Sequence, residues 1–205
     1  MKKVIVLLMV TGFIYGQSFD YIGVKKCSMC HKKEAKGAQL KQWQGSAHAN
    51  AFETLKNEES AKIAKEMGLK VPAYESAECL ICHSTGFGNG GYEVKDAEFW
   101  AQKTEKGKPT KDVILMSNLQ AVGCESCHGP GSKFKSTKTM KAIFTDAVEG
   151  KTVGLWEPNE QVCIACHNKK SPTYKEFKFA ERIGEYTHPI PTEMRKELLE
   201  KYTTK

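Results

Sequence analysis

Long apolar runs are scarce in this sequence of 205 residues. The one clear run extends from Val4 to Ile14, after Met1-Lys2-Lys3, and falls short of the roughly 20 residues that a membrane-spanning helix needs. A short apolar run between basic residues and the small Gly16 is typical of a secretory signal peptide. We therefore expect residues 1–16 to be a cleaved signal peptide and 17–205 to form one periplasmic domain without stable membrane insertion. A retained N-terminal anchor is the alternative, and it would change tethering but not chemistry.

Signals for a nucleic-acid partner and for a parallel sheet are also missing. The net charge is +7, from 31 basic and 24 acidic residues, and the lysines are dispersed instead of forming one basic run. No stretch interleaves aromatic with basic residues, and no nucleic-acid-reading motif is present. Strands alternating with amphipathic helices, the pattern of a parallel sheet, are absent as well. We expect neither a nucleic-acid partner nor an α/β architecture.

Cysteine does not occur outside a single motif. The eight cysteines all belong to four copies of Cys-x-x-Cys-His, and the chain has six histidines in total. The four copies are Cys27, Cys30 and His31; Cys79, Cys82 and His83; Cys124, Cys127 and His128; and Cys163, Cys166 and His167.

The spacing of this motif suits covalent attachment of haem. Two intervening residues separate the thiols as the two vinyl groups of haem require, and the next histidine can ligate iron from the proximal side. Disulfides or zinc sites would use the cysteines but would leave the four adjacent histidines unexplained. We therefore predict four covalently bound haem c groups, with the motif histidines as proximal ligands.

The spacing of the motifs leaves too few residues per haem to build four separate cores. We expect a mainly α, compact multihaem cytochrome c with short helices and extensive loops wrapped around four haems. The patterns predict helix over Glu34–Leu55, with His48, Phe52 and Leu55 on one face, and over 60–67 up to Gly68. They also predict a Gly-rich turn at 86–91, an extended segment at 92–94, a surface loop at 103–112, and a terminal helix at 192–202 with Leu198 and Leu199 inward.

Histidine is too scarce to ligate four irons twice. Four of the six histidines are proximal ligands, so only His48 and His188 remain for the distal side. Two haems can then be bis-histidine, and the other two need a methionine thioether, a neutral lysine amine or an open five-coordinate iron. The methionines that could serve are Met67, Met116 and Met140.

Several segments resemble the tetrahaem cytochrome c-554 family of ammonia-oxidising bacteria. The resemblance is most specific where Val122-Gly123 leads into the third motif and Gly129-Pro130-Gly131 follows it. The other segments are Gly23–His31, Ser46-Ala47-His48-Ala49, Cys79–His83 with Gly86-Phe87-Gly88 and Gly90-Gly91-Tyr92, and Phe177-Lys178-Phe179 ahead of His188. Together they span nearly the whole chain after residue 16.

This resemblance implies a periplasmic electron carrier whose haems lie in stacked pairs. Its implied partners are a hydroxylamine oxidoreductase-like multihaem enzyme as donor and a membrane quinone-linked cytochrome as acceptor. Three haems of the family are bis-histidine, and the haem of the second motif, here held by His83, is five-coordinate. Nitric oxide reduction has been proposed at that open iron.

One stretch departs from the family. The family's third distal histidine follows the Gly-Pro-Gly of the third motif, where this chain has Lys138 and, two residues on, Met140. We therefore expect the haem of His128 to be the second unusual one, with Lys138, Met140 or an open position on its distal side.

Electron transfer between redox partners, in hydroxylamine- or nitrite-type respiration, is the leading hypothesis for function. A small haem enzyme that reduces nitric oxide or hydroxylamine at an open iron is the alternative, and a subunit of a polymerised cytochrome wire is a third. We therefore expect an electron carrier rather than an enzyme, with nitric oxide reduction as a side activity.

Overall fold

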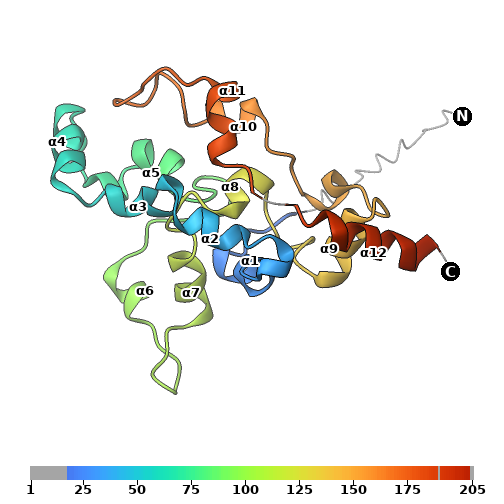
Figure 1. Ribbon diagram of the computed structural model, residues 1–205. Helices are drawn as coiled ribbons and strands as arrows, with labels where there is room; N and C mark the ends of the chain where they lie inside the picture. The colour runs from blue at the N-terminus through green and yellow to red at the C-terminus, as the bar shows by residue number, and fades with distance from the viewer. Residues whose placement is uncertain (1–17, 189, 204–205) are drawn as a thin grey trace, which may run out of the picture.

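The computed structural model describes residues 18–188 and 190–203, and these residues are mainly helical (Figure 1). They form no strand, and one isolated antiparallel bridge joins Lys103 and Pro109 in the predicted surface loop. No helix in this part of the chain has the length and apolar character to cross a bilayer. The α-helices are α1 Val24–His31, α2 Gln39–Gln44, α3 Ala51–Thr54, α4 Glu58–Glu66, α5 Ala77–His83, α6 Ala97–Ala101, α7 Lys111–Ser117, α8 Cys124–His128, α9 Thr137–Phe144, α10 Glu160–Ile164, α11 Phe179–Arg182 and α12 Thr192–Thr203; the 3-10 turns are η1 Glu34–Lys36, η2 Ala47–Asn50, η3 Ala73–Glu75, η4 Gly150–Val153 and η5 Ile183–Glu185. The predicted mainly α fold with short helices is confirmed.

Local sequence explains where several of these helices begin and end. The side chain of Asn57 accepts a hydrogen bond from the backbone of Ser60 at 2.8 Å and so caps α4. After α4 the chain turns through Gly68, whose φ of 71° is accessible to glycine at little cost. The predicted helix before Gly68 is confirmed, as is the C-terminal helix α12. The side chains of Leu198 and Leu199 lie outside the described residues.

The predicted helix over Glu34–Leu55 is wrong in its continuity. The segment is divided into η1, α2, η2 and α3 because Gly37, at φ 93°, ends the first turn and Ser46 is extended. Phe52 and Leu55 are nevertheless buried, at 2% and 5% exposure, as their shared face predicts. Because these short pieces are separate, each can direct its side chains toward the site independently of the others.

The apolar core is small and lies around the second motif. It consists of Tyr21, Phe52, Leu55, Ala64, Ala73, Leu80, Tyr92 and Leu119. Outside this cluster the described buried hydrophobic residues are only Val113, Ala121 and Phe134. So few buried side chains are a weak core for a chain of this length, which fits an interior completed by bound cofactors.

Two adjacent residues of the second motif offer a matched test of this core. Leu80 is fully buried whereas Ile81 is 61% exposed. We expect Leu80→Ala to lower the free energy of unfolding of the haem-loaded protein by about 2–5 kcal/mol, because it leaves a cavity. Ile81→Ala should change it by less than about 0.5 kcal/mol. Denaturant unfolding followed by circular dichroism measures both, and equal losses would contradict this description of the core.

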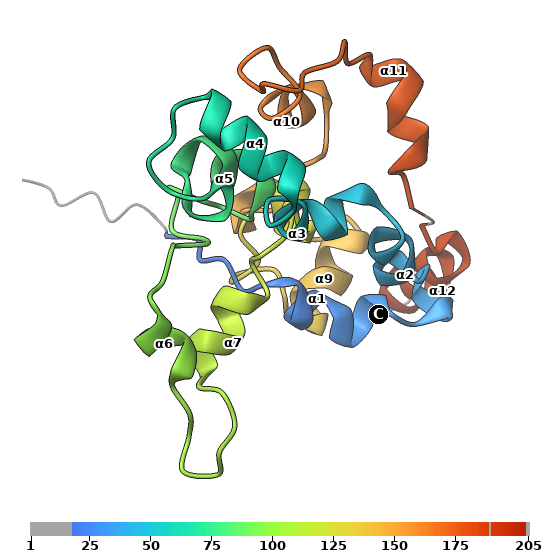
Figure 2. The same cartoon turned by 90° about the vertical axis from the view of Figure 1, so that its left-hand side faces the viewer.

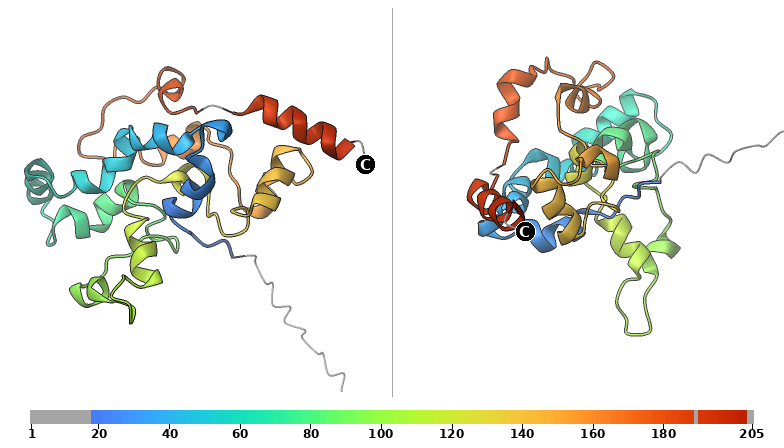
Figure 3. Two further views of the ribbon diagram at one scale, coloured as in Figure 1. Left: turned by 60° about the horizontal axis from the view of Figure 1, so that its bottom comes forward. Right: turned by 90° about the vertical axis from the view of Figure 1, so that its right-hand side faces the viewer.

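Of the four motif helices, α8 lies nearest the centre of the molecule (Figure 1). In Figure 1, α8 lies between α10 and α1, and α8 contacts both of these helices. The loop between α6 and α7 projects away from this centre in Figures 1 and 2. Helix α12 projects on another side, as Figure 3 shows. Segments that are far apart in the sequence therefore meet around the motifs, as α1 and α10 do at α8.

Candidate haem sites

Each motif begins on a short helix. Helices α1, α5 and α8 end at His31, His83 and His128, while α10 ends before Cys166 and His167. In a helix, residues three apart lie on the same face, so both thiols of a motif can face one cofactor. All eight cysteines are partly buried and none forms a disulfide. The set of thiols fits haem attachment.

Two proximal histidines are oriented by hydrogen bonds from their Nδ1 atoms. His31 pairs with Oε1 of Gln39 at 3.1 Å, and His83 pairs with the carbonyl oxygen of Ala51 at 2.7 Å. Because a carbonyl oxygen can only accept, Nδ1 carries the proton and Nε2 is left to ligate a metal. This is the tautomer that a haem iron requires of its histidine.

His48, on η2, faces the histidine of the fourth motif. The ring centres of His48 and His167 are 6.1 Å apart. An iron bound at about 2 Å by one nitrogen of each of two imidazoles holds their ring centres about 6 Å apart. Burial lowers the pKa of His48, with a smaller contribution from His167, and so favours the neutral ring that can bind metal.

His188 faces the histidine of the third motif in the same way. The ring centres of His128 and His188 are 5.9 Å apart, again the separation that a shared iron requires. The pKa of His128 is lowered chiefly by burial and also by the neighbouring His188. The two histidines outside the motifs are thus each brought to a different motif.

The segment before α12 holds these rings in place. Phe177 stacks on His167 with ring centres 4.5 Å apart. The ring centre of Tyr186 lies 4.6 Å from that of His48. Gln42, on α2, donates a hydrogen bond to the carbonyl oxygen of Thr187 and so anchors the backbone next to His188. One C-terminal segment therefore supports both facing pairs of histidines.

Cysteine contacts show how the motifs follow one another in space. Cys27 of the first motif lies beside Cys124 of the third, and their helices α1 and α8 are in contact. Cys82 of the second motif likewise lies beside Cys166 of the fourth. Cys127 interacts electrostatically with a cysteine of the fourth motif. The first motif thus adjoins the third, the third adjoins the fourth, and the fourth adjoins the second.

Glu125 is a structural residue of the site that the sequence analysis did not identify. It lies between the thiols of the third motif and is 3% exposed. Its carboxylate accepts hydrogen bonds from the backbone of Ile22, Gly23 and Gly131 at 2.7–3.1 Å. Burial raises its pKa, although these hydrogen bonds oppose the shift. Glu125 thereby holds the start of α1 against α8 and brings the first and third motifs together.

The glycine after the third motif is required by close packing. Gly129 has φ 78°, and a Cβ built there would lie 2.4 Å from the carbonyl oxygen of Gly154. The adjacent His128 carbonyl accepts a hydrogen bond from the backbone of Trp156 at 2.9 Å. The Cys-His-Gly sequence therefore reflects the contact of α8 with the segment that follows η4.

The other predicted ligands are not members of the facing pairs of rings. Lys138 is exposed and Met140 is half-buried, both on α9. Met67 is 40% exposed after α4, and Met116 packs against the apolar core. The structure places His188, and neither Lys138 nor Met140, across from His128.

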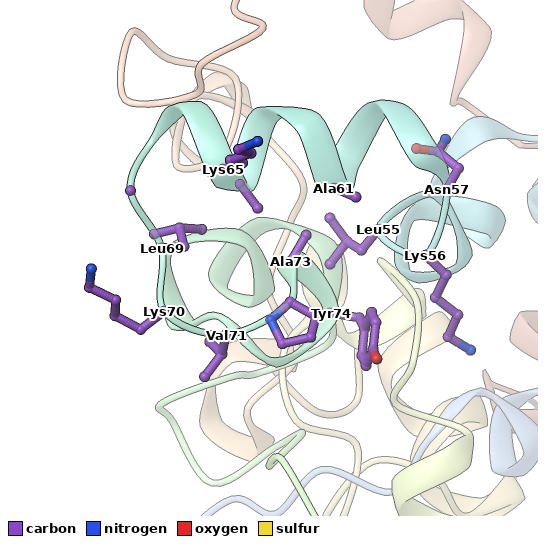
Figure 4. A pocket seen from close by; sticks show the side chains of 13 residues that line it. Leu55, Lys56, Asn57, Ala61, Lys65, Leu69, Lys70, Val71, Ala73 and Tyr74 are labelled. Atoms are coloured by element: carbon purple, nitrogen blue, oxygen red, sulfur yellow. The ribbon is translucent and has the colours of Figure 1, made fainter.

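A hollow of about 510 Å³ lies between α4, the loop after it and η3 (Figure 4). Its walls include Leu55, Ala73 and Tyr74, with Lys65 and Lys70 at its edge. None of the motif cysteines or histidines lines it, so it is separate from the haem sites.

Four attachment motifs on short helices, with two pairs of imidazoles at the spacing of shared irons, define a multihaem c-type cytochrome. A family model described as "Cytochrome c554 and c-prime" matches residues 26–129, which is half of the chain. The chain belongs to this family. It carries four covalently bound haem c groups, as predicted.

Two comparisons with known proteins agree with this family. Cytochrome c-554 of Nitrosomonas europaea is 40% identical over 156 residues, which cover 71% of this chain and 56% of that protein. The match therefore spans little more than half the length of that relative. The solved structure of reduced cytochrome c554 from Nitrosomonas europaea is also similar, with a TM-score of 0.51 and 29% sequence identity. This structural match covers 88% of the present chain and 84% of the chain in that structure.

Proposed function

We propose that this protein is a periplasmic electron carrier in the respiration of nitrogen compounds of the hydroxylamine or nitrite type. The proximity of the motifs carries this proposal: α8 contacts α1 and α10, and Cys82 on α5 lies beside Cys166, so all four motifs form one series. A series of closely spaced redox centres suits the passage of electrons through a protein. The order from one end to the other is second, fourth, third and first motif.

The residues of the chain have distinct tasks in such a carrier. When bound, the haems supply the one-electron redox chemistry of iron. His48 and His167 would hold the fourth iron, and His128 and His188 the third, each between two strong-field imidazoles. Such ligation keeps the coordination the same in both oxidation states and stabilises the oxidised form relative to methionine ligation. The rings of Phe177 and Tyr186 restrict the rotation of the ligand imidazoles.

The surface around the first motif would attract acidic partners. Lys25 and Lys26 precede its first cysteine, Lys32 and Lys33 follow its histidine, and all four are exposed. Positive charge beside a redox centre accelerates the encounter with an acidic surface. We infer that a hydroxylamine oxidoreductase-like enzyme donates electrons here and that a membrane quinone-linked cytochrome accepts them.

Stopped-flow absorbance spectroscopy tests this function. We expect substrate-reduced hydroxylamine oxidoreductase to reduce the oxidised protein at a rate that falls as ionic strength rises. The double variant Lys25→Gln/Lys26→Gln should be reduced more slowly and with a weaker salt dependence. Lys65→Gln/Lys70→Gln, with two exposed lysines on the hollow near α4, is the matched control and should behave as wild type. Reduction no faster with the enzyme than with hydroxylamine alone would refute the proposed donor.

A second candidate function is nitric oxide or hydroxylamine reduction at the haem of the second motif. The observation that favours it is that neither His48 nor His188 faces His83. An iron held by His83 alone would keep a position for a small molecule.

A further inference from the structure

The iron of the first motif, like that of the second, has no second histidine available as a ligand. All six histidines lie in the described part of the chain. Four belong to motifs, His48 faces His167, and His188 faces His128. His31 pairs with Gln39 through Nδ1, and the histidine with which it interacts electrostatically is His128, the proximal ligand of another motif. Neither spare histidine is paired ring to ring with His31.

Lys138, on α9, is unsuited to be the second ligand of the iron held by His31. A lysine ligates iron only as the neutral amine, a form that depends on burial of the side chain. Lys138 is exposed at the start of α9, where Ser136 caps the helix.

The methionine on α9 lies in a helix that is bound to another part of the chain. The ring of Phe144 packs under the guanidinium of Arg195 at 5.7 Å, and Arg195 also pairs with Asp146. These contacts join α9 to α12. Met140 on this helix is half-buried, and a half-buried methionine is more often a packing residue than a ligand.

The first and second motifs occupy equivalent places in the series. Each adjoins only one other motif through its cysteines: Cys27 adjoins Cys124, and Cys82 adjoins Cys166. The two motifs with facing histidines lie between them. The irons without a second histidine are thus the two ends of the series.

We propose that the iron held by His31 is a second open site, which binds small neutral π-acceptor molecules such as carbon monoxide and nitric oxide when it is reduced. This inference rests on the proposed assignment of His48 and His188 to the fourth and third haems, but not on the proposed electron donor. The series of four haems then has a ligand-binding iron at each end. A partner or small molecule that reacts at one end is coupled to the other through the two bis-histidine haems.

The chemistry of Gln39 agrees with such a site. Its amide oxygen accepts the Nδ1 proton of His31 without the negative charge that a carboxylate would bring. The imidazole of His31 therefore stays neutral and donates less electron density to the iron than it would beside a carboxylate. The reduced iron, which is the form that binds carbon monoxide, is correspondingly favoured.

Carbon monoxide titration of the dithionite-reduced holoprotein tests the inference. We expect two molecules bound per chain and two populations in the C–O stretching region of the infrared spectrum. Gln39→Leu, which removes the hydrogen bond to His31, should shift one band and leave the other in place. Gln44→Leu, on the same helix and exposed, is the matched control and should shift neither.

The other outcomes overturn the proposal. One carbon monoxide per chain, with a band that Gln39→Leu leaves in place, would mean that a side chain occupies the first iron, and Lys138→Ala and Met140→Ala would then identify it by raising the number to two. Two bound molecules with neither band sensitive to Gln39→Leu would place the second site at another haem. If Gln39→Leu fails to acquire haem, the wild-type stoichiometry and the Lys138 and Met140 variants decide. A failure of the donor assay would leave these readouts unchanged.

Discussion

Replacing His48 by alanine is expected to convert one low-spin haem into a high-spin haem. His48 lies 6.1 Å from His167 between ring centres, and no other histidine is placed to take over its position. The fourth iron would keep only His167 and would open to exogenous ligands. Electron paramagnetic resonance of the oxidised holoprotein should show one bis-histidine signal fewer, and the reduced form should bind one more carbon monoxide per chain than wild type.

Two further variants separate ligation from packing at this position. His48→Met keeps a sixth ligand, so it should retain a low-spin haem while raising its potential, because a thioether favours reduced iron. Gln44→Ala, on the preceding helix and exposed, should leave all signals unchanged. An unaltered spectrum in His48→Ala would show that His48 is not a ligand.

Replacing His188 by alanine should have an equally large effect, but at the third haem. His188 faces His128 at 5.9 Å, and its neighbour Thr187 is anchored by Gln42. Loss of the imidazole would leave the third iron with His128 alone and remove a second low-spin signal. Because the third haem lies inside the series, reoxidation through the protein should also slow.

The combination of variants makes this prediction specific. His48→Ala and His188→Ala act on different irons, so the double variant should lose both bis-histidine signals. Ile190→Ala, 65% exposed and two residues beyond His188, is the matched control. If the His188 variant kept its low-spin signal and lost it only when Met140 or Lys138 was also replaced, α9 would supply the ligand of the third haem.

Many features of the fold could be predicted from local sequence. Asn57 and Gly68 mark the ends of α4 because a cap and a left-handed turn depend on the residues themselves. The shared face of Phe52 and Leu55 likewise follows from helical periodicity. The continuous helix over Glu34–Leu55 failed, since periodicity does not register the breaks that Gly37 and Ser46 introduce.

The role of Glu125 could not be predicted in this way. A glutamate between two cysteines has no local feature that predicts burial, and its three backbone partners include Ile22 and Gly23, about a hundred residues earlier in the chain. Its placement depends on the approach of α1 to α8. That approach is a tertiary contact whose partners are distant in sequence.

The amino-acid sequence alone establishes that this protein carries four haems and that it has too few histidines to ligate every iron with two. The motif spacing and the count of six histidines are properties of the chain, whatever its fold. Only the tertiary structure decided which motif each spare histidine faces, because His48 and His167 are separated by more than a hundred residues and their distance depends on how the whole chain packs. It places His188 at the third motif, where sequence reasoning had expected a deficit. The proposed open irons are therefore those of His31 and His83, at the two ends of the series.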